Sequence, residues 1–126
     1  MSRRRCFILI AALGAIGLSG RAWAEASGTI AANPNPCMIA PGAVECTSHI
    51  TWSTQGATHA KVFVVGPHKN GTRETEFGVG LSCESQKCRA PWIKREHSYV
   101  FTLYDYSSGT RGRALATVTV TGKGGK

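Results

Sequence analysis

The segment PNPCMIAPGAVECTSHITW, residues 34–52, decides the fold of this chain. Its second half alternates apolar or small residues with polar ones, and a period of two is typical of a strand with one face toward a core. A turn-prone Ala-Pro-Gly precedes this strand. We therefore expect a strand over residues 44–52 that ends in an inward-facing tryptophan. Its inward positions are Val44, Cys46, Ser48, Ile50 and Trp52.

Four of the five cysteines lie beyond the first 24 residues, and they predict structural disulfides. They are Cys37, Cys46, Cys83 and Cys88, whereas Cys6 lies in the N-terminal segment that is expected to be removed. Four cysteines allow three pairings. The local pairing of Cys37 with Cys46 and of Cys83 with Cys88 is favoured, because each pair brackets turn-prone sequence. A zinc site or a redox-active dithiol is the alternative, but such sites typically place two residues between cysteines, whereas these pairs have eight and four.

Short alternating segments elsewhere predict further strands. These segments are residues 29–32, 60–65, 72–77, 99–104 and 115–121. Asn70 and Gly71 offer the two positive-φ positions of a tight hairpin turn before the third of them. Tyr99, Phe101 and Leu103 share one face of their strand. Six or seven short strands in about 100 residues predict an all-β fold, a single antiparallel β-sandwich.

The first 24 residues predict an export signal. Three arginines at positions 3–5 form a basic head, residues 6–18 are an apolar run, and Ala22-Trp23-Ala24 fits a signal-peptidase site. The arginines suit general secretion and also the twin-arginine pathway. The run is shorter than the roughly 20 residues that span a bilayer, and no later segment is apolar enough. We expect cleavage after Ala24, a periplasmic or secreted domain over residues 25–122 and a flexible tail over 123–126.

The charge of the chain is basic, with a formal net charge of +8 that includes the arginines of the predicted signal. A basic surface favours anionic partners such as acidic glycans or an envelope surface. Nucleic acid is not expected as a partner, because no dense stripe of Lys and Arg interleaved with aromatic residues occurs. No membrane span is expected once the signal is removed.

The segments NPNPC, ITWST, APWI, HSYVFTLYD and LATVTVTG, in this order, resemble the fibronectin type III and wider immunoglobulin-like modules of exported bacterial proteins. The resemblance covers residues 28–122. It implies an Ig-like sandwich of about seven strands with Trp52, Tyr99 and Phe101 in the core, and a Cys37–Cys46 staple between the first strands. It also implies a binding or spacer role without catalytic residues.

Candidate chemistry is sparse. Glu74 and Glu76 lie two apart on one strand face, which an exposed strand explains better than a catalytic pair of carboxylates. The four histidines, at positions 49, 59, 68 and 97, do not have metal-ligand spacing. We therefore expect no enzyme activity, no metal and no cofactor.

Surface residues carry the predicted binding function. Arg111 and Arg113, in the loop 107–113, could pair with carboxylates or sulfates, with Lys94 and Arg95 extending a basic edge. Trp92 could stack on a sugar, although a plug at the end of the core is favoured for it. The prediction is a non-catalytic binding module for a glycan, an envelope surface or a protein. The alternatives are an assembly protein that pairs through its sheet edges, and a secreted enzyme inhibitor that uses the 83–88 loop.

Overall fold

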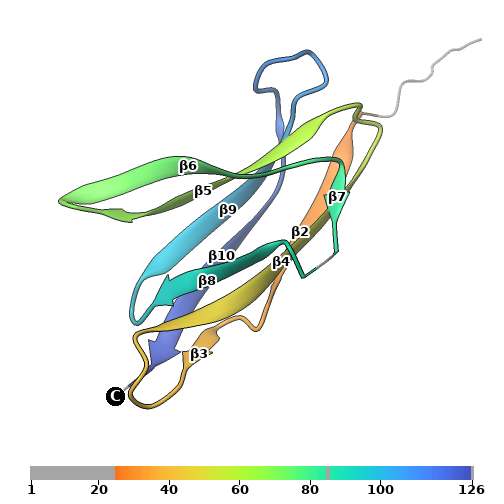
Figure 1. Ribbon diagram of the computed structural model, residues 1–126. Coiled ribbons are helices and arrows are strands. Elements are labelled where there is room, and N and C mark those ends of the chain that lie inside the picture. The colour runs from red at the N-terminus through yellow and green to blue at the C-terminus, as the bar shows by residue number, and fades with distance from the viewer. Residues whose placement is uncertain (1–24, 85, 126) are drawn as a thin grey trace, which may run out of the picture.

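The computed structural model describes residues 25–84 and 86–125, so the predicted signal over residues 1–24 lies outside the described residues. Within these ranges the chain is all-β, without a helix, and forms two sheets (Figure 1). The strands are β2 (Ser27–Asn33), β3 (Cys37–Ile39), β4 (Glu45–Gln55), β5 (Ala60–His68), β6 (Gly71–Val79), β7 (Ser82–Cys83), β8 (Arg89–Lys94), β9 (Ser98–Asp105) and β10 (Ala114–Gly124).

The first sheet has the strand order β3-β10-β9-β5-β6, and its pairs are antiparallel except for β3 with β10. The second sheet is built on β4, which has β2 along one side. β7 and β8 follow one another along the other side of β4. Each sheet therefore ends in an edge strand on the side where β6 and the β7–β8 pair lie.

The alternation in β4 sets which side chains enter the core. Ser48, Ile50 and Trp52 are buried, as their phase predicts. The Ser48 hydroxyl donates a hydrogen bond of 2.9 Å to the Pro34 carbonyl, which satisfies the one polar side chain that is buried among the described residues. Val44 was expected to face inward and is instead 75% exposed, because it lies in the turn before the first residue of β4.

The core lies between the sheets and draws its apolar side chains from both. The exposed fractions of Trp52, Tyr99 and Phe101 are 3%, 7% and 0%, so all three expected core residues are buried. Their main companions are Ile50, Ala60, Val62, Val64, Ala90, Ile93, Leu103 and Val120. Burial of these side chains supplies the main favourable term in folding.

Two local expectations are corrected. The hairpin turn between β5 and β6 is Lys69-Asn70 rather than Asn70-Gly71, with the positive φ at Lys69 and Gly71 paired with His68 inside the ladder. The C-terminal tail also begins later than expected. β10 continues to Gly124 because Lys123 and Gly124 pair with Met38 and Ile39 of β3.

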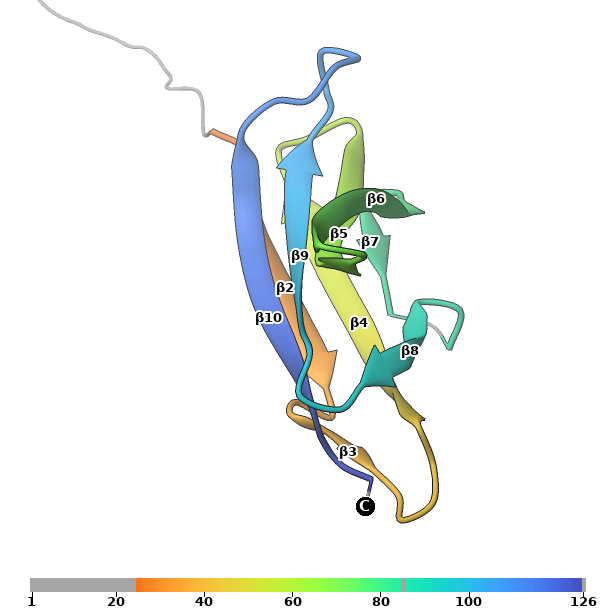
Figure 2. The ribbon, with the colours of Figure 1, turned by 90° about the vertical axis from the view of Figure 1, so that its left-hand side faces the viewer.

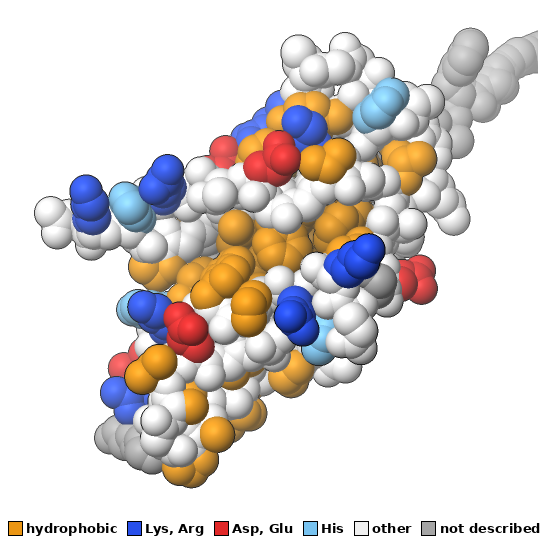
Figure 3. All heavy atoms as spheres, viewed as in Figure 1, with side chains coloured by type: hydrophobic (Ala, Val, Ile, Leu, Met, Phe, Trp, Pro, Cys, Tyr) orange, Lys and Arg blue, Asp and Glu red, His pale blue; other side chains and the backbone are white. Residues whose placement is uncertain are grey.

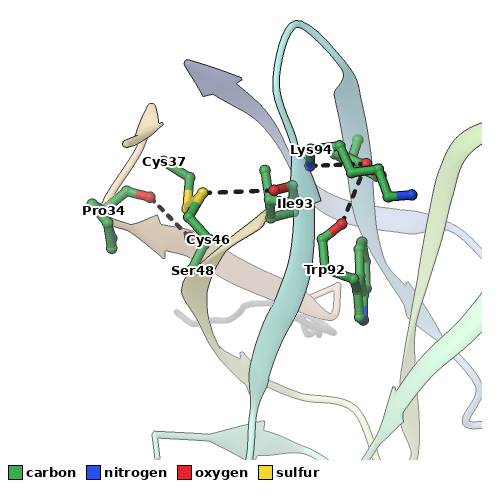
Figure 4. The surroundings of a disulfide bond; sticks show 8 residues. Pro34, Cys37, Cys46, Ser48, Trp92, Ile93 and Lys94 are labelled. Atoms are coloured by element: carbon green, nitrogen blue, oxygen red, sulfur yellow. Dashed lines mark hydrogen bonds between the residues drawn. A yellow bond between two sulfur atoms is a disulfide. The ribbon is translucent and has the colours of Figure 1, made fainter. Parts of the chain in front are cut away.

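Two disulfides join the cysteines in the favoured local pairing. The Cys37–Cys46 bond links β3 of the first sheet to β4 of the second, so it ties the two sheets together (Figure 4). The Cys46 sulfur lies 3.8 Å from the Ile93 carbonyl oxygen of β8. The Cys83–Cys88 bond closes the loop between β7 and β8. Disulfides of this kind are typical of an oxidising compartment.

The two long sides of the molecule differ. On one side β2 lies beside β10, which closes the space between the sheets (Figure 2). On the other side β6 packs chiefly on β5, and the chain passes from β6 directly to β7. The second sheet therefore covers only part of the inner face of β6 and leaves the rest of that face open. The candidate functional site lies on this open side.

Candidate functional site

A cleft of about 560 Å³ occupies the open side, between the inner face of the β5–β6 hairpin and β8. Figure 3 shows it as a hollow of hydrophobic side chains with Lys and Arg side chains on both walls. Its volume is within the range of about 300–1,000 Å³ that is usual for ligand sites. The lining residues are Val64, Gly66, Pro67, His68, Arg73, Thr75, Glu76, Phe77, Arg89, Trp92 and Tyr99.

Aromatic rings form the floor of the cleft. Trp92 is half-buried and lies nearly parallel to Phe101, with the ring centroids 6.1 Å apart and 19° between the planes. The Tyr99 ring meets Trp92 edge-on at 5.2 Å, and Phe77 meets it edge-on at 6.4 Å. Such pairs hold one another in place beyond simple area burial. Trp92 thus packs on the core, as favoured from sequence, while its remaining surface lines the cleft.

Tyr99 fixes β8 at the position that carries Trp92. Its hydroxyl donates a hydrogen bond of 3.4 Å to the Trp92 carbonyl and accepts one of 3.2 Å from the Lys94 backbone N–H (Figure 4). Gly66 makes room for the ring, because a Cβ at position 66 would lie 2.7 Å from Tyr99 Cδ2. A buried tyrosine therefore connects the two sheets beneath the cleft and holds its floor rigid.

Cationic side chains stand on the two walls of this cleft. Arg73 comes from β6 and Arg89 from β8, and both are exposed. Among the described residues neither guanidinium group has an ion pair or a hydrogen-bond partner. Glu76, the acid among the lining residues, is engaged by Lys61 at 3.3 Å. The cleft therefore offers two uncommitted guanidinium groups beside an aromatic floor.

The predicted binding residue Arg111 already binds other residues of the same chain. Its two terminal nitrogens donate hydrogen bonds of 2.9 and 3.3 Å to the carboxylate of Glu74. The guanidinium also lies 4.4 Å from the Phe63 ring centre and 4.2 Å from that of Tyr104. The hydrogen bond to Glu74 raises the pKa of Arg111 above its ordinary value. Arg111 was expected to offer a free guanidinium group for a partner. It instead binds Glu74 on the outer face of the first sheet and so acts as a latch that holds the loop there.

The rest of the 107–113 loop is also held internally. Arg113 donates to the Ala26 carbonyl, and its Nε lies 3.5 Å from the Glu25 carboxylate. At the base of the loop, Asp105 accepts hydrogen bonds from the hydroxyl and the backbone N–H of Ser107, at 2.6 and 2.9 Å. These bonds lower the pKa of the Asp105 carboxyl. The two arginines of this loop are therefore not free to donate hydrogen bonds to a ligand.

The expected basic edge is not continuous. Lys94 and Arg95 precede β9, whereas Arg111 and Arg113 follow it. A strand of this length spans roughly 25 Å, so the two pairs lie at opposite ends of the sandwich. Phe63, whose exposure was expected to separate a glycan site from a structural role, is half-buried beneath Arg111. Of the candidate binding residues, only Trp92 lines the cleft.

Other site classes find little support in the described residues. No group of three or more His, Cys, Asp or Glu side chains there is arranged to hold a metal ion. Glu74 and Glu76, the two strand acids, each pair with a basic side chain. The part of the chain that the structure describes also contains no helix long and apolar enough to cross a membrane.

Three of the aromatic and arginine residues that line the cleft were not singled out from sequence, namely Arg73, Phe77 and Arg89. The alternation of β6 does place Arg73 and Phe77 on the face opposite Glu74 and Glu76. Nothing in the sequence places Arg89 across from them. Comparisons with protein-family models, curated proteins and solved structures found no match. Function is therefore inferred from the geometry of this chain.

Proposed function

We propose that this protein is an exported, non-catalytic, Ig-like binding module that holds an anionic partner in the cleft between β6 and β8. The strand order supports the Ig-like part of the proposal. In Ig-like sandwiches, strands A, B and E lie in one sheet and strands C, F and G lie in the other, so the chain crosses repeatedly between the two sheets. Here β2, β4 and β8 share one sheet, while β5, β6, β9 and β10 share the other.

Export is supported by two features. Residues 1–24 have the basic head, apolar run and small-residue cleavage site of a signal peptide. The two disulfides fit folding in an oxidising compartment. Both point to a periplasmic or extracellular setting, where the accessible polymers include anionic ones.

One observation carries the binding proposal. Arg73 and Arg89 are the charged groups on opposite walls of an aromatic cleft, and no described residue neutralises them. Guanidinium groups suit planar anions because they donate parallel hydrogen bonds. A cleft that is apolar at its floor and cationic at its rim selects an anion that also has an apolar face.

The test compares two double variants that each remove two positive charges. Arg73→Ala with Arg89→Ala alters the cleft, whereas Arg95→Ala with Lys123→Ala alters exposed positions outside it. Proteins are eluted by salt from matrices carrying a carboxylated polysaccharide, a sulfated polysaccharide and an acidic peptide. We expect the cleft variant to elute at clearly lower salt from at least one matrix, and the control to stay close to the wild type.

The two variants must keep the circular dichroism and melting temperature of the wild type, which shows that the comparison concerns binding. Identical elution of both variants on all three matrices would mean that retention depends on net charge alone. The cleft would then not be the binding site, and the proposed function would fail.

The alternative of an assembly protein that pairs through its sheet edges is less well supported. Both edges beside the cleft are guarded against strand addition. β8 contains Pro91, which has no N–H to donate, and β6 carries the run Arg73-Glu74-Thr75-Glu76. The inhibitor hypothesis rests on the loop between β7 and β8, whose Ser85 lies outside the described residues.

A further inference from the structure

We infer that the anionic partner is an acidic polysaccharide and that the cleft holds one of its carboxylated sugar units. This inference rests on the proposed function and deepens it by naming the class of ligand. It depends on three properties of the cleft, which are its stacking surface, the type of charge on its rim and the guarded strand edges beside it.

The stacking surface is Trp92. Phe101 lies nearly parallel to the indole with the ring centroids 6.1 Å apart, and Tyr99 and Phe77 hold it by edge contacts. Part of this half-buried side chain lines the cleft, which gives the cleft an apolar aromatic surface on a rigid support. The C–H face of a pyranose ring is complementary to such a patch, and stacking there leaves its equatorial hydroxyls pointing to the polar rim.

The rim favours a carboxylate. Arg73 and Arg89 can each donate paired hydrogen bonds to a planar carboxylate. The Glu76 side chain lies with that of Glu74 on the opposite face of β6 and pairs with Lys61, so it does not compete for these two guanidinium groups. The rim is therefore matched to the planar carboxylate of a hexuronic acid unit.

The strand edges argue against an acidic peptide, which would be the other source of carboxylates. An extended peptide gains affinity by main-chain hydrogen bonds to a free edge. Pro91 removes a donor from the edge of β8, and charged side chains flank the edge of β6. A sugar chain needs no such bonds, and it can enter and leave a cleft that is open to solvent along one side.

The experiment measures the binding of four defined probes to the purified protein by calorimetry and by tryptophan fluorescence. The probes are trigalacturonate, its methyl ester, a sulfated disaccharide from heparin and triaspartate. We expect trigalacturonate to bind, and we expect esterification to weaken binding about tenfold or more, since the ester loses the negative charge that strengthens the hydrogen bonds from Arg73 and Arg89. A Trp92→Phe variant should lose the fluorescence change and bind more weakly while remaining folded.

The same double variants locate the site. Arg73→Ala with Arg89→Ala should weaken trigalacturonate binding about tenfold or more, and Arg95→Ala with Lys123→Ala should change it less than about twofold. Equal binding of the acid and its ester, or tighter cleft-dependent binding of the sulfated probe or triaspartate, would overturn the inference and leave the proposed function standing. Failure of every anionic probe to bind in a cleft-dependent way would overturn both.

Discussion

Trp52 shows how single side chains set the shape of this protein. Its indole N–H donates a hydrogen bond of 3.0 Å to the Gly80 carbonyl, and its ring meets Phe77 edge-on at 6.3 Å. Gly78 of β6 lies against the far end of the indole, where a Cβ would be 2.6 Å from Trp52 Cη2. The glycine is therefore needed by packing, and the tryptophan supports the strand that forms one wall of the cleft.

The first prediction from this contact concerns Gly78→Ala. Overpacking of this kind costs about 1–3 kcal/mol, so we expect the free energy of unfolding in urea to fall by that amount. In a Trp52→Phe background, where the smaller ring leaves space, the same substitution should cost less. Gly71→Ala is the control, since nothing lies within 4 Å of a Cβ there. An equal cost of Gly78→Ala in both backgrounds would contradict the packing account.

The loop between β9 and β10 is held in place by a residue of another strand, Glu74 of β6. Glu74 is on β6, and its carboxylate holds the guanidinium of Arg111 over Phe63 of β5 and Tyr104 of β9. The Arg111–Glu74 pair is partly exposed, so its ion pair contributes modestly. Stacking on the two rings adds a further modest contribution. Together these contacts keep the loop folded against the first sheet.

Removal of the Glu74 carboxylate should therefore release the loop without unfolding the sandwich. We expect native-state cleavage by trypsin after Arg111 to become about two- to fivefold faster in Glu74→Ala, as loss of an exposed pair allows. Glu76→Ala is the matched control, because it removes an acid from the same strand face that pairs with Lys61 instead. Equal cleavage rates in the two variants, measured by mass spectrometry of the fragments, would show that Arg111 is not a latch.

For the molecule as a whole, the two disulfides have different roles. The Cys37–Cys46 bond joins strands of different sheets, and Cys37 is fully buried. The Cys83–Cys88 bond closes a short loop at the outer edge of the second sheet, where both cysteines are half-buried. The first bond therefore supports the packing of the sheets, whereas the second shapes the connection into β8.

We expect each bond to stabilise the fold by about 2–3 kcal/mol, because it restricts the conformations of the unfolded chain. Replacement of Cys37 and Cys46 by Ala should lower the free energy of unfolding further, because it also leaves a cavity in the core. Replacement of Cys83 and Cys88 by Ala should cost less. Urea unfolding of the two double variants gives the comparison, and a larger loss for the Cys83 and Cys88 pair would mean that the sheets are held by packing alone.

Local patterns in the sequence were sufficient for the pairing of the cysteines, for the buried face of β4 and for six strands, namely β2, β4, β5, β6, β9 and β10. The shorter strands β3, β7 and β8 were not predicted. A period of two and a turn between nearby cysteines are properties of short segments, and burial of one face follows from them. The pattern was less reliable at the ends of elements. Val44, the Lys69-Asn70 turn and the extension of β10 to Gly124 were decided by where a neighbouring strand begins or ends.

The candidate site was decided by the tertiary structure. Trp92 was visible in the sequence, but Arg73 and Arg89 meet it only because β6 leaves the open side uncovered and β8 lies across from it. Arg111 looked free because its partner Glu74 is 37 positions away. Contacts across sheets join residues that no local period relates. Strand pattern therefore predicts which side chains face a core, while the order of strands in the sheets determines which charges remain free.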